Sequence, residues 1–304
     1  MAARSLAAPS ARTGATTAHR AQRGLLYVVA LLVAGLFMGP FLFSLMTSPK
    51  APGELYALPP ILVPSEPQWS NYLTVWDYRG IPFSTFYLNT VMIVLAATAG
   101  NLIAASLSAF GFARFRWQGR DFFFMVLLST LVLPEEVVII PKFLMFTFAP
   151  EYLFGRPWID TWWPLILPAW VGGGAFNVFL LRQFFMQIPR DLDDAAVIDG
   201  AGYGQILFRI ILPLAKPAVA TVAIFSFLGH WNDFIHPLIY LSSIEKFPLS
   251  VGLRWFQAQP FDPTEPREHL LMTAAMLMMV PCVAIFFAMQ RYFVRGIILS
   301  GLKG

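Results

Sequence analysis

The chain has 304 residues, of which 57% are hydrophobic and 12% are charged, against roughly 45–50% and 25% in soluble domains. This composition excludes an ordinary soluble fold, and it excludes disorder except at the chain ends, so we predict an all-α polytopic membrane protein. Cys282 is the only cysteine, which rules out a disulfide within the chain. In such a protein the net charge of +4 reports membrane orientation rather than a nucleic-acid partner.

The first segment, residues 1–23, begins rich in Ala, Ser, Thr and Arg without apolar periodicity, and we predict a disordered N-terminal tail. Residues 24–304 are predicted to form a single six-helix transmembrane domain, because crossing a bilayer takes about 20 apolar residues. Six segments meet that length: Gly24–Met46, Thr85–Gly111, Asp121–Phe148, Thr161–Phe184, Leu214–His236 and Leu270–Phe293.

The positive charges between these spans indicate the orientation of the chain. Fourteen of the 21 Lys and Arg residues lie in the two termini, the second-to-third connection and the fourth-to-fifth connection. Because cationic loops resist translocation, we expect that side to be cytoplasmic, with both termini facing inward.

Glu135 and Glu136 lie well inside the third predicted span, directly after Pro134. Ionised carboxylates at such depth are costly unless they face protein, water or a cation. Lys142 is seven residues from Glu135 and nearly on the same helical face, so we expect the two to pair. The acids could line a translocation cavity as hydrogen-bond acceptors, or form an ion pair that positions a proline-broken helix.

A second polar cluster, His230, Asn232 and Asp233, lies near the end of the fifth predicted span. Because no further ligand is within reach by sequence, we predict no metal site here. Asn232 and Asp233 could instead tie helix ends together or line a cavity wall. In the fourth span, Gly172-Gly-Gly174 indicates close helix packing or a flexible break.

The connection between the fourth and fifth spans, residues 189–213, predicts a helix–turn–helix loop on the cytoplasmic side. Pro189 stops the preceding helix, Asp191 is placed to N-cap a short helix, and Gly200 permits a sharp turn. A second short helix is expected over Tyr203–Leu212. By spacing alone, the loop could dock into a groove on another protein or lie on the membrane as an amphipathic elbow. One face of the first helix carries mostly small residues: Leu192, Ala195, Ala196 and Asp199.

The loop resembles the EAA loop of permease subunits in bacterial ABC importers, with Asp194 where that family usually has Glu. The matching positions are Asp194-Ala-Ala, Gly200, Ile210 and Leu212-Pro213. Two further stretches are similar to carbohydrate-uptake permeases of the maltose type: Trp231-Asn-Asp-Phe234 with Pro237-Leu238, and the C-terminal Gln290–Gly296 with Gly301–Gly304.

The resemblance implies a prokaryotic inner-membrane permease subunit that forms half of a path for a sugar or oligosaccharide. It also implies an extracytoplasmic solute-binding protein, two ATPase subunits and a homologous second permease in a heterodimer, with a homodimer as the alternative. The ATPase-contact positions carried over from that family are Asp194, Ala195, Ala196, Asp199, Gly200 and Ala201. The candidate translocation-path residues are Glu135, Glu136, Asn232 and Asp233.

Several motifs are missing from the sequence. It contains no phosphate-binding loop, and the dipeptide Gly-Lys does not occur, so we expect ATP and Mg²⁺ to be bound by a partner and no cofactor by this chain. No catalytic constellation is recognised, and we do not expect an enzyme. The alternative function is an ion-coupled secondary transporter that uses Glu135, Glu136 and Asp233, which would leave the 189–213 loop unexplained.

Overall fold

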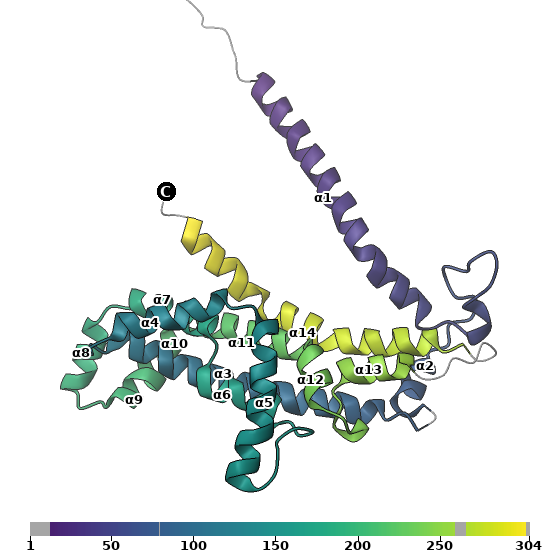
Figure 1. Ribbon diagram of the computed structural model, residues 1–304. Coiled ribbons are helices and arrows are strands. Elements are labelled where there is room, and N and C mark those ends of the chain that lie inside the picture. The colour runs from purple at the N-terminus through teal and green to yellow at the C-terminus, as the bar shows by residue number, and fades with distance from the viewer. Residues whose placement is uncertain (1–12, 79, 259–265, 302–304) are drawn as a thin grey trace, which may run out of the picture.

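The computed structural model describes residues 13–78, 80–258 and 266–301, and within them every named element is helical. Most helices run alongside one another in an elongated bundle, and the first helix leaves it at an angle (Figure 1). The longer helices are α1 (Thr13–Thr47), α3 (Phe83–Arg114), α4 (Arg120–Ser129), α5 (Glu135–Phe154), α6 (Trp163–Gly172), α7 (Ala175–Gln187), α11 (Lys216–Trp231), α13 (Leu249–Ala258) and α14 (Glu268–Gly301).

Shorter helical elements connect these helices. They are η1 (Pro52–Glu54), α2 (Asn71–Thr74), η2 (Val75–Asp77), η3 (Thr130–Val132), α8 (Asp191–Ile198), α9 (Tyr203–Gln205), the π-helix η4 (Ile206–Ile211), α10 (Leu212–Leu214), α12 (Ile235–Tyr240) and η5 (Ile244–Lys246). In Figure 1, α8 and α9 lie at one end of the bundle, and α2 lies at the other. The 189–213 loop and the segment after α1 therefore occupy opposite ends.

The described residues contain five helices that are long and apolar enough to cross a membrane, and a sixth if one bent pair is a single span. That pair is Tyr203–Leu214 with Lys216–Trp231, and its two parts meet at 85°. The six predicted spans overlap these stretches, but three of them are not continuous helices. The fourth is divided between α6 and α7, and the fifth ends at Trp231, before α12.

The prediction of an uninterrupted third span, Asp121–Phe148, is wrong. Helix α4 ends at Ser129, one 3-10 turn follows, and Leu133 takes an extended backbone with ψ 119°. The cause is Pro134, which disfavours helical geometry in the residue before it and has no amide hydrogen to donate. As a result Glu135 begins α5 instead of lying in mid-helix.

The first helix is longer than predicted. Helix α1 begins at Thr13, so residues 13–23, which were expected to belong to a disordered tail, are helical. Residues 1–12 of the predicted tail lie outside the described part of the chain. From 24 to 39, the side chains of α1 are exposed, although most are apolar, and α1 packs mainly against α14.

Two apolar cores stabilise the bundle, one toward each end. The core near α2 joins α3 to α13 and α14 through residues such as Phe86, Phe256 and Leu270. The other core joins α3, α7 and α11 to the 189–213 loop, with Phe185, Ala196 and Ile206 among its buried members. The loop is therefore packed into the same core as three long helices.

Candidate functional site: a helical loop and a polar cavity

The first helix of the 189–213 loop begins one residue earlier than predicted. Asp191 is already helical, Arg190 precedes the helix, and no side chain caps the N-terminus. The prediction that Asp191 is the N-cap is therefore wrong. Asp191, Asp193 and Asp194 all lie in the first turn, where their negative charge complements the positive end of the helix dipole.

The end of α8 is a Schellman turn centred on Gly200. The amide of Ala201 donates to the carbonyl of Ala196 at 2.8 Å, and the amide of Gly200 donates to the carbonyl of Val197 at 3.0 Å. Gly200 has φ +82°, a left-handed conformation that costs other L-residues about 1–2 kcal/mol. A Cβ at Gly200 would meet nothing within 4 Å, so the backbone angle, not crowding within the chain, favours glycine.

The second arm of the loop is helical over Tyr203–Leu214, which includes the predicted helix Tyr203–Leu212. Its middle half is the π-helix Ile206–Ile211, which the sequence pattern did not reveal. The arm is fixed to the core by three buried side chains: Ile206, Leu207 and Ile211.

The candidate ATPase-contact residues are not equally accessible. Asp194, Ala195, Asp199 and Gly200 are exposed, and Ala201 is half-buried. Ala196 is only 8% exposed and packs in the loop's own core, so it supports the loop from within. The small face predicted for α8 is thus divided between the surface and the interior. The surface also displays apolar side chains that the prediction did not include: Val197, Ile198, Tyr203 and Phe208.

Buried ionic and polar contacts attach the loop to the last turn of α3. The Nε atom of Arg114 lies 3.1 Å from Oδ2 of Asp193, and Nη1 of Arg114 donates to the carbonyl of Ile188 at 3.0 Å. Arg190 also donates, from Nη2, to the carbonyl of Ala113. Burial raises the pKa of Asp193 despite the neighbouring Arg114. From the sequence, Arg114 contributed only to the positive charge that indicates orientation, and its contact with Asp193 was not predicted.

A cavity of about 740 Å³ opens between α3, α5, α6, α7, α11 and α12. Its volume lies within the range of about 300–1,000 Å³ that small-molecule sites occupy. Its polar lining residues are Asn101, Thr130, Glu135, Lys142, Asn177, Ser226, His230, Asp233, His236 and Tyr240. The lining comes from segments more than 100 residues apart in the sequence, so no single motif could have indicated it.

Four ionisable side chains form a network on this lining. Oε1 of Glu135 lies 3.7 Å from Nζ of Lys142, so the predicted pairing is present. The same oxygen lies 3.2 Å from Nε2 of His236, whose Nδ1 is 3.0 Å from the carboxylate of Asp233. His236 therefore bridges two carboxylates, and it was not among the predicted site residues.

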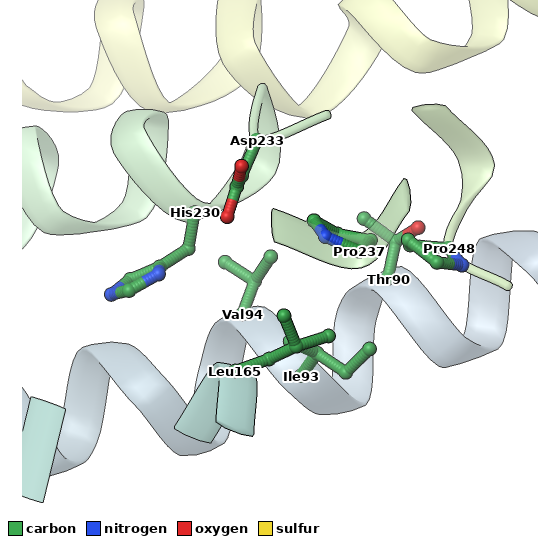
Figure 2. A pocket seen from close by; sticks show the side chains of 8 residues that line it. All are labelled: Thr90, Ile93, Val94, Leu165, His230, Asp233, Pro237 and Pro248. Atoms are coloured by element: carbon green, nitrogen blue, oxygen red, sulfur yellow. The ribbon is translucent and has the colours of Figure 1, made fainter. Parts of the chain in front are cut away.

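The other two candidate path residues lie outside the cavity lining. Glu136 is exposed, and the side chain of Asn232 donates to the carbonyl of Leu228 at 2.8 Å. This bond stabilises the end of α11 itself, whereas the role considered from the sequence was to tie helix ends together. Figure 2 shows His230 and Asp233 again beside a second space bounded by Val94 and Leu165. At about 10 Å³, this space holds no more than one water.

The break between α6 and α7 forms another part of the cavity wall. Gly173 and Gly174 have φ +65° and +72°, and a Cβ on Gly173 would clash with the backbone of Ala105. Both expectations for the glycine run, a break and close packing, are therefore met. Next to it, Nδ2 of Asn177 donates to Oδ1 of Asn101 at 2.9 Å and to the carbonyl of Gly173 at 3.2 Å.

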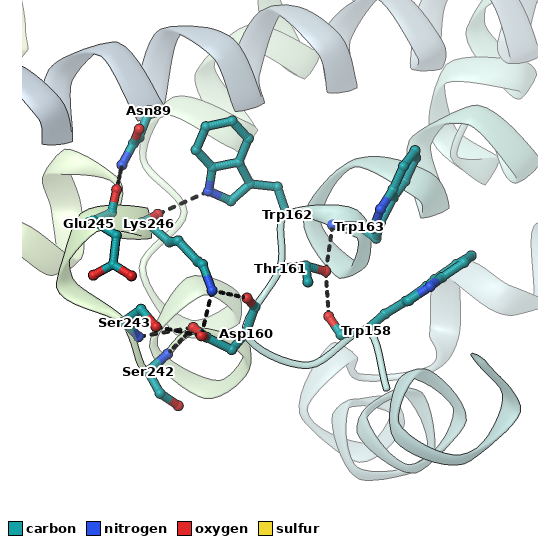
Figure 3. Close-up of polar contacts among 10 residues, drawn as sticks. All are labelled: Asn89, Trp158, Asp160, Thr161, Trp162, Trp163, Ser242, Ser243, Glu245 and Lys246. Atoms are coloured by element: carbon teal, nitrogen blue, oxygen red, sulfur yellow. Dashed lines mark hydrogen bonds and ion pairs between the residues drawn. The ribbon is translucent and has the colours of Figure 1, made fainter. Parts of the chain in front are cut away.

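A polar clamp secures the segment between α5 and α6 (Figure 3). Oδ1 of Asp160 accepts from the amides of Ser242 and Ser243, both at 2.9 Å, and its Oδ2 lies 2.7 Å from Nζ of Lys246. These donors, with the Ser243 hydroxyl, outweigh the effect of burial and hold the pKa of Asp160 well below its usual value. Asp160 has φ +59°, and the clamp holds it in that conformation.

Solved structures of ABC transporters have this fold. The chain superposes on a chain of a bacterial ABC transporter that imports the acidic polysaccharide alginate, with a TM-score of 0.76 and 22% identity. The match covers 94% of this chain and 100% of the other. A second structure of a bacterial alginate transporter, in complex with an alginate pentasaccharide-bound periplasmic protein, gives a TM-score of 0.62 at 16% identity.

Relatives of known function are also permeases. The arabinooligosaccharides transport system permease AraQ of Halalkalibacterium halodurans is 32% identical over 244 residues, covering 80% of this chain and 82% of that protein. The sn-glycerol-3-phosphate transport system permease UgpE of Yersinia enterocolitica is 30% identical over 287 residues, covering 92% and 98%. Residues 99–299 match the family of inner membrane components of binding-protein-dependent transport systems. The chain therefore belongs to that family, and it is an inner-membrane permease component of an ABC importer.

Proposed function

We propose that this permease carries a sugar or oligosaccharide that an extracytoplasmic solute-binding protein delivers. Similarity to an arabinooligosaccharide permease and to alginate importers supports a carbohydrate cargo. The cavity supports it as well, because hydroxyl, amide and carboxylate groups from several helices converge there. In this function the chain supplies half of the translocation path and performs no chemistry on the cargo.

The 189–213 loop is the contact with a separate ATPase, which binds ATP and Mg²⁺. The observation that carries this assignment is that the loop has one exposed side and one side buried in the core of the bundle. Its outer face exposes Asp194, Ala195, Asp199 and Gly200, while Ala196 is buried in the core shared with α3, α7 and α11. A partner that moves the exposed face therefore moves the buried side with it, and through it three long helices.

The proposed assembly has two permease chains and two ATPase subunits. One chain presents one such loop, so a second loop for a second ATPase must come from another permease, which we propose is homologous but not identical. Helix α1 supports a neighbour of this kind, because its residues from 24 to 39 are exposed. Lipid and the second permease would cover that surface. We also propose that both termini face the cytoplasm, on the side of the loop.

The coupling follows from linkage. ATP binding can shift the permease between inward-facing and outward-facing states only through contacts that differ between those states. The loop provides such contacts, and its links to α3 pass the movement to the helices that wall the cavity. The breaks at Pro134 and at Gly173 divide two of those walls into shorter segments that can move separately.

The experiment that tests this function is reconstitution of the assembly in proteoliposomes, with its ATPase and binding protein added or omitted. We expect uptake of labelled oligosaccharide only when both partners and ATP are present. The network of Glu135, His236 and Asp233 gives the ion-coupled alternative its best support. Uptake driven by a proton or sodium gradient without the ATPase would establish that alternative and overturn the proposed function.

A further inference from the structure

Another cavity, of about 310 Å³, lies where the chain turns between α3 and α4. Helix α3 is a candidate membrane span that ends at Arg114, and α4 is entirely apolar from Phe122 to Leu128. The cavity therefore lies at a boundary between the membrane interior and water. Its lining residues are Arg116, Trp117, Gly119, Arg120, Asp121 and Phe122.

This cavity lies on the same side of the membrane as the 189–213 loop. The Phe115 ring, next to the cavity, packs edge-on against Tyr203 of the loop, with ring centroids 4.9 Å apart. Figure 1 shows α4 and α8 at the same end of the bundle. The lipid leaflet that adjoins this end is therefore the one that meets the cavity.

The side chains around the cavity carry a net positive charge. The carboxylate of Asp121 is already paired, because its Oδ1 lies 2.9 Å from both Nε and Nη2 of Arg120. Arg182 on α7 lies near enough to interact electrostatically with both of these residues. Arg116 is exposed and makes no hydrogen bond or ion pair with the described part of the chain. Its guanidinium is therefore available to an anion.

An exposed apolar surface runs from the cavity along α4. Phe124 faces inward, where its ring meets Phe112 of α3 and Phe179 of α7. The side chains on the outer side remain uncovered: Phe122, Phe123, Met125 and Val126. Trp117 is exposed at the rim of the cavity, and tryptophan is enriched at the level of the lipid headgroups.

A phospholipid with a net negative charge fits both parts of this surface. Guanidinium groups bind phosphate oxygens through charge-assisted hydrogen bonds, and acyl chains cover apolar side chains. A free phosphate would use the positive charge but leave the outer side of α4 uncovered. A zwitterionic lipid would bring a cationic group toward the arginines, which they repel.

We infer that the cavity between α3 and α4 binds the headgroup of an anionic phospholipid. Arg116 holds the phosphate, Arg120 and Arg182 add positive charge, and the exposed side of α4 receives the acyl chains. The inference goes beyond the proposed function, because it concerns neither the cargo nor ATP. It places a negatively charged lipid beside the 189–213 loop.

Photo-cross-linking in lipid nanodiscs tests the site. The complete permease–ATPase assembly is reconstituted in neutral lipid with a small amount of phosphatidylglycerol or phosphatidylcholine, each with a photoreactive group on the acyl chain near the glycerol. We expect phosphatidylglycerol to label residues 115–126 roughly fivefold more than phosphatidylcholine does, the worth of about one charge at the membrane surface. Equal labelling by the two lipids would overturn the inference. Labelling of this segment by neither would show that a partner subunit covers it, and would also overturn the inference.

Substitution of Arg116 locates the headgroup contact. Arg116→Gln should reduce labelling of residues 115–126 by phosphatidylglycerol roughly fivefold and leave labelling by phosphatidylcholine unchanged. Arg116→Lys keeps the charge and should retain most of the labelling. In lipid-free detergent, Arg116→Gln should unfold at the same temperature as the unmodified assembly, because this guanidinium has no partner in the described chain.

The matched control is Arg156→Gln, which removes an exposed arginine from the connection between α5 and α6. It should leave labelling of residues 115–126 unchanged. If Arg116→Gln were labelled like the unmodified assembly, Arg116 would not hold the phosphate and the inference would fail.

Soluble glycerophosphoglycerol, the headgroup without acyl chains, distinguishes a lipid from a free phosphodiester. At millimolar concentration it should leave the labelling intact, because the acyl chains supply the apolar contacts along α4. Competition that abolished the labelling would show that the cavity binds the phosphodiester alone, and would overturn the assignment of a lipid. Because the cargo enters none of these measurements, their failure leaves the importer function untouched.

Discussion

The guanidinium of Arg114 and the carboxylate of Asp193 join the end of α3 to the first helix of the 189–213 loop, with Nε and Oδ2 separated by 3.1 Å. The Arg114 side chain is only 4% exposed. A buried ion pair often contributes little more to stability than apolar residues would, but removing one partner leaves a buried charge uncompensated. The pair therefore acts mainly as a geometric constraint between the loop and the longest fully described span.

This relationship makes Arg114→Leu a test of the link between the loop and α3. The substitution leaves Asp193 unpaired, so we expect the free energy of unfolding to fall by about 3 kcal/mol. We also expect uptake per ATP hydrolysed to fall. The double variant Arg114→Leu/Asp193→Leu should recover most of the stability but not the uptake, because the constraint is still absent.

Thermal unfolding of the purified assembly and paired uptake and hydrolysis assays measure both effects. The control is Arg116→Leu, which neutralises a charge two residues further along, outside α3. If the double variant transported as well as the unmodified protein, the Arg114–Asp193 pair would have no part in coupling.

The break between α6 and α7 at Gly173 gives a second prediction. In Gly173→Ala the new Cβ clashes with the backbone of Ala105 and the residue must also keep φ +65°. Overpacking of this kind costs about 1–3 kcal/mol, and the positive φ adds about 1–2 kcal/mol. Gly172→Ala is the matched control, because its Cβ would meet nothing within 4 Å. The two melting temperatures should differ by several degrees, and equal values would contradict the packing described here.

Features of this structure that arise from neighbouring residues could be predicted from the sequence, whereas contacts between distant residues could not. Apolar length located the five long apolar helices and the bent pair that could form a sixth span, and the spacing of Pro189, Gly200 and Pro213 located the helical loop. These features follow from local chemistry, namely hydropathy and backbone conformation.

The interruptions within the spans were harder to predict. Pro134 is followed by an apolar run that satisfies the length rule for a membrane helix, which concealed the break that places Glu135 at the start of α5. The Asn232 cap and the π-helix in the loop also depend on backbone geometry that hydropathy does not encode.

The candidate site is formed by contacts between residues that are far apart in the sequence. His236 meets Glu135 across about a hundred residues of sequence, and Arg114 meets Asp193 across nearly eighty. A single sequence carries no signal for such pairs. His236 could have been suspected, since it lies three residues after Asp233 and can contact it on a helical turn.

The Asp160 clamp gives a prediction about stability and pH. Asp160→Asn removes the ion pair with Lys246, and a hydrogen bond to a charged group is worth about 1.5–3 kcal/mol. Because the pKa of Asp160 is depressed in the folded protein, its contribution is fully present above the ordinary aspartate pKa and is lost only as the pH falls through the lower folded value.

The stability difference between the two proteins should therefore be constant from about pH 5 to pH 8. Chemical unfolding at several pH values measures it, with Glu245→Gln as a neighbouring control, because no dashed line joins the Glu245 carboxylate to the clamp in Figure 3. A difference that vanished near pH 6 would show that Asp160 is not held ionised by these contacts.

The most direct test of ATP-driven coupling through the loop compares Gly200→Ala with Gly200→Trp, with hydrolysis and uptake measured in the same vesicles. Both substitutions bear the same backbone strain at φ +82°, and neither side chain meets a neighbour within the chain at its Cβ. They differ only in the bulk presented to a partner. We predict that Gly200→Ala retains most of its uptake per ATP, and that Gly200→Trp reaches the membrane but loses at least tenfold in that ratio. Uptake per ATP at the unmodified level in Gly200→Trp would contradict the account.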